Sequence, residues 1–168
     1  INLAVAGIAV GTVMLPELSK YIKNDNYEQA LNLQNRALEL CLFLSIPAAV
    51  ALVLASDEII TSLFGYGSFD IESVNNTAIA LTFFAFGVPA FSILKIFSNF
   101  FFSRNDTKLP FYLSVVSVII NILISVSLFS RLGFVIIPIA TSISSWINVF
   151  LHLYFIKKKN FHSFDSEF

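Results

Sequence analysis

Charged residues are scarce in this chain. They make up 12% of its 168 residues, against 57% hydrophobic residues, and the mean hydropathy is +0.81. A soluble domain of this length needs far more polar surface. The formal net charge of −1 provides no basic excess, and the lysines do not form a stripe along one helix. Nucleic acid is therefore not expected as a partner.

Residues that carry chemistry are equally few. Cys41 is the single cysteine and there are two histidines, so the sequence has neither a disulfide framework nor the ligand spacing of a zinc site. A nucleophile elbow, a P-loop and a dinucleotide-binding fingerprint are all missing. We therefore expect no catalytic residues, no metal site and no organic cofactor, and we do not expect an enzyme.

Long apolar runs are what the sequence has instead. A membrane-crossing helix needs about 20 mostly apolar residues, and five stretches approach or exceed that length. We predict an all-α membrane protein whose five transmembrane helices lie at about 1–22, 37–56, 74–103, 109–130 and 132–157. The stretch at about 25–36 has apolar residues at helical spacing behind an Asn-Asp-Asn start signal, which predicts a short amphipathic helix at the membrane surface. Because the chain opens at Ile1 inside an apolar run without an initiator Met, we expect it to be part of a longer protein.

Positive charge gathers on one side of these five helices. Lysine and arginine mark the cytoplasmic loops of membrane proteins, whereas acidic residues count for little. Only Arg131 falls on the opposite side, and Lys95 lies inside a helix. We therefore predict that loops 16–36 and 103–108 and the tail 157–168 are cytoplasmic. The basic residues of that side are Lys20, Lys23, Arg36, Arg104, Lys108, Lys157, Lys158 and Lys159.

Three of the predicted helices carry a polar stripe. Steps of three and four residues place its members on one helical face. The stripes are Ser92, Lys95 and Asn99; Ser114, Ser117, Asn121 and Ser125; and Thr141, Ser144 or Ser145, Asn148 and His152.

Such stripes have two interpretations. Small polar groups often hydrogen-bond between packed helices, and any single serine is best explained that way. Three stripes that include three asparagines and a lysine fit a shared hydrated cavity equally well. We therefore name Lys95, Asn99, Asn121 and Asn148 as candidate cavity residues. Gly7 and Gly11 form a G-x-x-x-G pair that would let another helix approach closely.

Six segments, in order along the chain, carry a family resemblance. They are GIAVGTVMLPELS at 7–19, RALEL at 36–40, IPAA at 46–49, LFGYGSF at 63–69, KIFSNFFFSRNDTKLP at 95–110 and ATSISSWIN at 140–148. The set resembles sequence signatures of the MurJ (MviN) lipid II flippases, of the MOP exporter superfamily. The resemblance covers nearly the whole chain.

The resemblance implies a C-terminal-lobe portion of a transporter with about fourteen helices. Residues 1–157 would form the eighth to twelfth of them, and residues 158–168 a cytoplasmic tail. The full protein would move an undecaprenyl-pyrophosphate-linked peptidoglycan precursor, lipid II, across the bacterial inner membrane by alternating access in cell-wall biosynthesis. Its partners would be the N-terminal lobe, the last two helices and membrane lipids. Alternatives are a lipid-linked polysaccharide exporter of the same superfamily and a membrane scaffold that does not transport.

The resemblance is incomplete at two places. The cationic residues with which the family meets the pyrophosphate lie mostly in the N-terminal lobe. Some members bind sodium at positions that correspond to Asn121, Ser125 and Thr141, but they have an aspartate where this chain has Ser125. A neutral hydroxyl compensates the charge of sodium poorly. Sodium and the membrane potential are both expected candidates for the coupling source.

Overall fold

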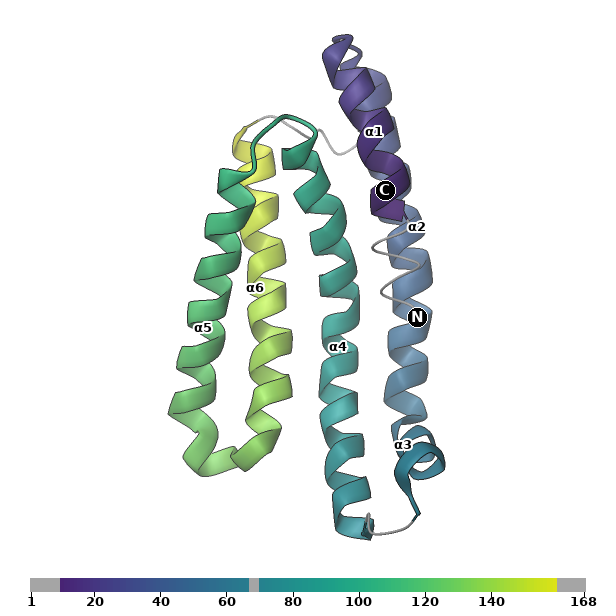
Figure 1. Ribbon diagram of the computed structural model, residues 1–168, viewed down its shortest axis with the longest axis vertical. Coiled ribbons are helices and arrows are strands. Elements are labelled where there is room, and N and C mark those ends of the chain that lie inside the picture. Colours follow the sequence, from purple (N-terminus) through teal and green to yellow (C-terminus); the bar gives the residue numbers. More distant parts are fainter. Residues whose placement is uncertain (1–9, 67–69, 160–168) are drawn as a thin grey trace.

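The protein is helical in all the parts that its structure, a computed structural model, describes, namely residues 10–66 and 70–159. The long helices run along nearly one direction (Figure 1). No strand occurs within these two ranges, so the predicted all-α class is confirmed. The elements are α1 (Val10–Lys23), α2 (Tyr27–Leu54), α3 (Ser56–Phe64), α4 (Ile71–Phe102), α5 (Lys108–Leu132), the 3₁₀ turn η2 (Gly133–Val135) and α6 (Ile136–Lys158).

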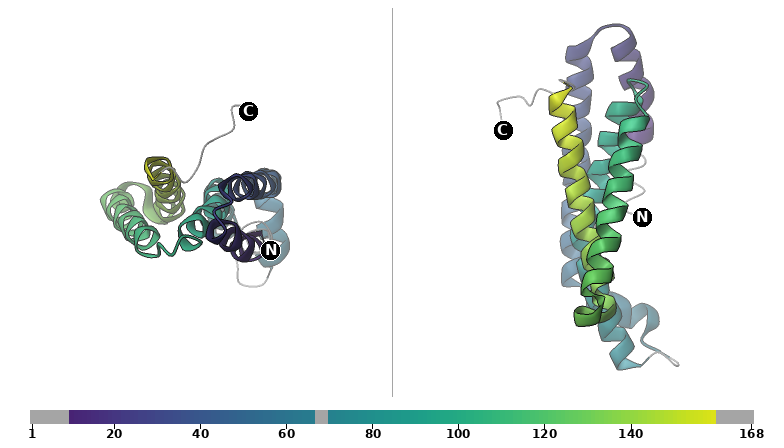
Figure 2. Two further views of the ribbon diagram at one scale, coloured as in Figure 1. Left: turned by 90° about the horizontal axis from the view of Figure 1, so that it is seen from above. Right: turned by 90° about the vertical axis from the view of Figure 1, so that its left-hand side faces the viewer.

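Helix α4 is the centre of the lobe. Seen along the bundle, it lies between the α1–α2 hairpin on one side and the α5–α6 hairpin on the other (Figure 2). Its aromatic side chains Phe97, Phe100 and Phe101 are at most 5% exposed and form much of the apolar core with α1, α2 and α6. Helix α5 packs mainly on α6, which leaves most of its surface exposed.

Three stretches of the described chain are long and apolar enough to cross a membrane: Tyr27–Leu54, Ile71–Phe102 and Lys108–Lys158. The third stretch reverses direction at η2, so it supplies two antiparallel helices, α5 and α6 (Figure 1). The described part of α1 has 14 residues, which is shorter than a membrane span. The rest of the helix predicted at 1–22, including Gly7, lies outside the described residues.

The structure corrects one prediction: the stretch at about 25–36 does not form a separate surface helix. Helix α2 runs unbroken for 28 residues from Tyr27 to Leu54. The reason is a single buried face that continues through the expected boundary, since Ala30, Gln34, Ala37 and Cys41 are all buried. Because this face packs on neighbouring helices, the amphipathic stretch is the first part of α2. Arg36 therefore lies within a helix and not in a loop.

The sequence does not predict helix α3, because residues 57–73 fall between the helices predicted at 37–56 and 74–103. Its first turn carries Asp57 and Glu58, which favour a helix N-terminus. The Thr82 hydroxyl donates to the Ser56 hydroxyl at 3.0 Å, and Ile60 is 6% exposed, so α3 is fixed against α4.

Local polar contacts and one glycine set the remaining boundaries. The Asp70 carboxylate accepts a hydrogen bond from the Ser73 amide at 2.8 Å, which starts α4 at Ile71, earlier than the predicted residue 74. Gly133 has a φ of +59°, a conformation that glycine adopts without strain, and it ends α5. The chain then turns back into α6.

The charged residues divide between the two ends of the lobe. The α1–α2 turn, the α4–α5 loop and the end of α6 share one end, while the starts of α3 and α4 and the α5–α6 turn share the other (Figure 1). We call the first the basic end. Its lysines and arginines come from segments far apart in sequence.

Candidate functional site

Lys95 is a cation in the last quarter of α4 and it is exposed. None of the described residues forms a hydrogen bond or an ion pair with its ammonium group. It lies seven residues before the end of α4, roughly 10 Å at the helical rise. Among the polar residues predicted to line a cavity, Lys95 is therefore the one whose polar group is left open.

Asn99, one turn beyond Lys95, joins α4 to α1. Its side-chain nitrogen donates to the Gly11 carbonyl at 2.8 Å. A Cβ on Gly11 would lie 2.7 Å from that nitrogen, so only glycine permits this close approach. The amide of Asn99 is thus used between helices, and it holds α1 beside the face that carries Lys95.

The polar stripes of α5 and α6 bond to each other. The Ser117 hydroxyl donates to the Ser144 carbonyl at 2.7 Å. The Asn121 side-chain nitrogen donates to the Thr141 hydroxyl at 3.1 Å and to the Ser144 hydroxyl at 3.3 Å. These contacts form a seam that we call the α5–α6 polar seam. Between these two helices the stripes act as interhelical hydrogen bonds.

The three candidate sodium ligands lie together at this seam. The Ser125 hydroxyl donates to the Asn121 side-chain oxygen at 3.5 Å, while the Asn121 nitrogen faces Thr141. Sodium would need oxygen atoms directed at a common point and a nearby negative charge. The three residues are neutral, and the amide directs a donor toward Thr141. In this arrangement they do not fit a sodium ion.

Asn148 is buried in α6 together with His152. Their side chains are 7% and 1% exposed, and the His152 ring nitrogen Nδ1 is 3.0 Å from the Asn148 carbonyl. The His152 ring also packs edge-on against Phe101 of α4. Among the described residues, nothing bonds to the Asn148 side-chain oxygen. Asn148 therefore lies inside the lobe and not on its open surface.

Two donors that the sequence did not single out join α6 to α4. The Ser142 hydroxyl donates to the Phe83 carbonyl at 2.6 Å, and the Trp146 indole donates to the Phe86 carbonyl at 3.0 Å. Neither carbonyl is that of Ala85, the residue four positions before Pro89 that loses its helical donor to the proline. The proline within α4 was therefore not a signal for these two contacts.

The grooves near Trp146 are apolar. One, of about 300 Å³, lies between α2, α4 and α6, and a second of about 340 Å³ lies between α4 and α6. Neither is lined by Lys95 or Asn121. A polar substrate site would therefore need surfaces beyond these two grooves.

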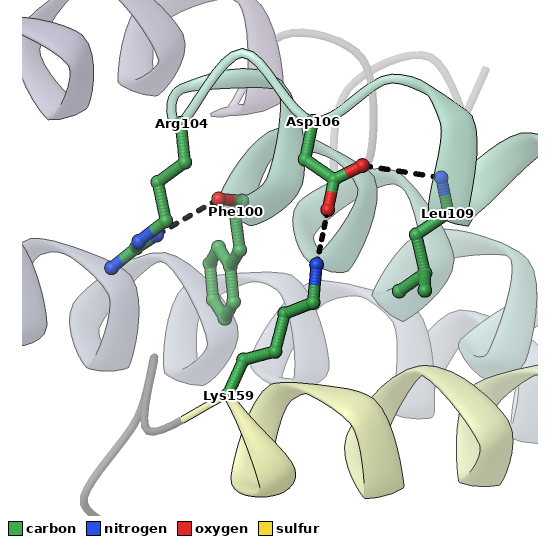
Figure 3. Close-up of polar contacts among 5 residues, drawn as sticks. All are labelled: Phe100, Arg104, Asp106, Leu109 and Lys159. Carbon is green, nitrogen blue, oxygen red and sulfur yellow. Dashed lines mark hydrogen bonds and ion pairs between the residues drawn. The ribbon is translucent and has the colours of Figure 1, made fainter.

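The α4–α5 loop is tied to the end of α6 (Figure 3). One Asp106 oxygen accepts from the Leu109 amide at 3.2 Å, and the other forms an ion pair with the Lys159 ammonium. That hydrogen bond from Lys159 holds the pKa of the Asp106 carboxyl below its ordinary value. Arg104 donates to the Phe100 carbonyl at 2.8 Å, and burial lowers the pKa of its guanidinium.

Known proteins match this chain over almost all of its length. The family model described as "Lipid II flippase MurJ" matches residues 1–167. A "Probable lipid II flippase MurJ" of Rhizobium meliloti (strain 1021) is 40% identical over 149 residues, which are 89% of this chain and 28% of that protein. Its counterpart in Rickettsia prowazekii (strain Madrid E) is 34% identical over 161 residues, 95% of this chain and 32% of that protein.

A solved structure agrees with these sequences. The structure described as "Lipid II flippase MurJ, inward closed conformation" superposes with a TM-score of 0.83 at 28% identity, covering 95% of this chain and 34% of that one. The chain thus spans about a third of the length of the proteins it matches. With the helices, the exposed lysine and these likenesses together, the chain is a membrane protein that belongs to the lipid II flippase MurJ family.

Proposed function

We propose that this chain forms one lobe of a lipid II flippase, which works by alternating access together with the rest of a longer protein. The family match over residues 1–167 supports this function. The share of about a third of each relative supports the role of a lobe. The relatives are named probable lipid II flippases, so we expect transport and not catalysis. The observation that carries the proposal is the exposed, unpaired ammonium of Lys95 within an apolar helix.

A cation in this position needs water or an anion. A lysine at the centre of a membrane helix costs about 3 kcal/mol, and such residues face a hydrated cavity or a partner. Lys95 lies nearer the basic end than the middle of α4. The pyrophosphate of a lipid-linked substrate sits at headgroup depth, and an ammonium group binds phosphate as a point charge. We assign Lys95 to that pyrophosphate as the substrate enters from the basic end.

The three asparagines have a supporting part in this proposal. Asn99 and Asn121 bond to neighbouring helices, and Asn148 is buried. Asn99 keeps α1 beside α4, and Asn121 keeps α5 on α6. The coupling source, sodium or the membrane potential, stays a prediction.

The orientation is part of the same proposal. We place the basic end, with the α1–α2 turn and the α4–α5 loop, in the cytoplasm of a bacterium and the chain in its inner membrane. The excess of lysine and arginine at that end supports this orientation.

Complementation tests the function. The full-length protein should restore growth to cells depleted of their own lipid II flippase. Restoration of lipid-linked polysaccharide export without restoration of growth would favour the other exporter class. Cysteine placed at position 95 should react with an aqueous thiol reagent in intact membranes. An unreactive cysteine there, with normal folding, would contradict the cavity and favour a scaffold.

A further inference from the structure

The positive groups of the basic end differ in their surroundings. Lys159 is paired with Asp106, and Arg104 donates to a backbone carbonyl (Figure 3). Lys20 and Lys23 share the α1–α2 hairpin with Glu17, Asp25 and Glu28. The exposed lysines where α5 begins and α6 ends belong to neither of these two groups.

Two exposed lysines mark that place. Lys108 is the first residue of α5 and Lys158 the last of α6, and these antiparallel helices pack on each other. The nearest carboxylate in the α4–α5 loop, that of Asp106, is occupied by Lys159 and the Leu109 amide. The ends of α5 and α6 thus present two ammonium groups.

Exposed tyrosines lie one turn inside each lysine. Tyr112 follows Lys108 by four residues and Tyr154 precedes Lys158 by four, so both rings lie roughly 6 Å further into the membrane. Their exposed fractions are 64% and 59%. The Lys158 ammonium is 6.0 Å from the Tyr154 ring centre, and Phe111, also exposed, packs edge-on against Tyr112.

The lysines lie at the helix ends and the tyrosines one turn further into the bundle. This order matches the phosphate and headgroup regions of a membrane surface. Tyrosine rings settle at headgroup depth, where the ring contacts acyl chains and the hydroxyl contacts water. Lysines reach from there to the phosphate layer, and each attracts anionic lipid with about 1 kcal/mol. The same order of side chains, a lysine at the helix end and an exposed tyrosine one turn inside it, occurs on both helices of this packed pair.

We propose that the α5–α6 end binds the headgroup of an anionic phospholipid. Lys108 and Lys158 contact the headgroup charge, and Tyr112 and Tyr154 contact the glycerol and upper acyl region. This surface is distinct from the face of α4 that carries Lys95, and its partner is a bulk membrane lipid and not the transported substrate.

The test uses the full-length protein in nanodiscs that contain phosphatidylcholine with or without phosphatidylglycerol. Lipids that remain bound after extraction are counted by native mass spectrometry. The wild-type protein should retain phosphatidylglycerol over phosphatidylcholine. The double variant Lys108→Gln, Lys158→Gln should lose that preference about tenfold or more, whereas the arginine double variant should keep it.

Lys20→Gln with Lys23→Gln is the matched control, since these lysines lie at the same end among acidic residues. This control should retain the preference for phosphatidylglycerol. Equal loss in the control, or a glutamine variant that folds normally and keeps the preference, would overturn the proposal. Displacement of the lipid by millimolar inorganic phosphate would likewise overturn it, because it would indicate a free phosphate site.

Discussion

The α5–α6 polar seam and the open face of α4 show two uses of the same sequence pattern. Both carry polar side chains at steps of three and four residues. In the seam, the donors of Ser117 and Asn121 find acceptors on α6. On α4, the Asn99 amide donates to a carbonyl of α1, whereas the Lys95 ammonium has no acceptor among the described residues. A polar stripe in a membrane helix therefore indicates a function only where the opposite surface leaves it unpaired.

Lys95 gives the largest expected effect. Lys95→Ala in the full-length protein should lower transport about tenfold or more, because a charge that meets the pyrophosphate is lost. Lys95→Arg should retain most of it. Growth complementation measures the effect, and detergent thermal unfolding should change little because the side chain is exposed. Full transport by the alanine variant would remove Lys95 from the substrate path.

Gly11 tests the contact that frames this face. Gly11→Ala places a methyl group 2.7 Å from the Asn99 nitrogen, which breaks its hydrogen bond to the Gly11 carbonyl. We expect a loss of about 1 to 3 kcal/mol in the free energy of unfolding, as for other overpacked sites. Asn99→Ala added to it should recover part of the loss. If the double variant is less stable than Gly11→Ala alone, the clash between the new methyl group and Asn99 is not the cause of the stability loss.

Asn121 tests the seam. Asn121→Leu should lower stability by about 0.6 kcal/mol, with an upper range near 1.7, as interhelical hydrogen bonds do in membranes. Ser127→Leu, at an exposed position of the same helix, is the control and should change little. Steric trapping in bicelles measures both. A transport loss in Asn121→Leu that exceeds its stability loss would instead indicate a direct role in transport.

Asp106 gives the smallest effect and a pH dependence. The pKa of Asp106 is lowered in the folded protein. Its contribution to the free energy of unfolding is therefore complete above the ordinary pKa of about 3.9, and it is lost as the pH falls through the lowered pKa. Because Lys159 is 37% exposed, solvent screening limits the pair to about 0.5 kcal/mol. Asp106→Asn should thus destabilise the protein at pH 7, and progressively less as the pH falls below about 3.9 through the lowered pKa, in thermal unfolding. Equal destabilisation over this whole pH range would assign the effect to the Leu109 contact.

Local patterns were sufficient for much of the fold. Hydropathy predicted helices that became α2, α4, α5 and α6, because an apolar run of that length has no other stable form in lipid. The sequence missed α3, and it divided α2 at residue 36. Both errors have one cause: burial on a neighbouring helix, through Ile60 in α3 and Gln34 in α2, is not visible in the sequence.

The candidate site divides in the same way. The sequence by itself determined which residues are polar within apolar helices, since spacing and hydropathy are properties of one segment. Only the tertiary structure decided that Asn99 bonds to Gly11 and that Asn121 bonds to Thr141. It also decided that Lys95 has no such partner among the described residues. The physical reason is that a hydrogen bond needs two partners in reach, and the second partner lies 88 residues away for Asn99 and 20 for Asn121.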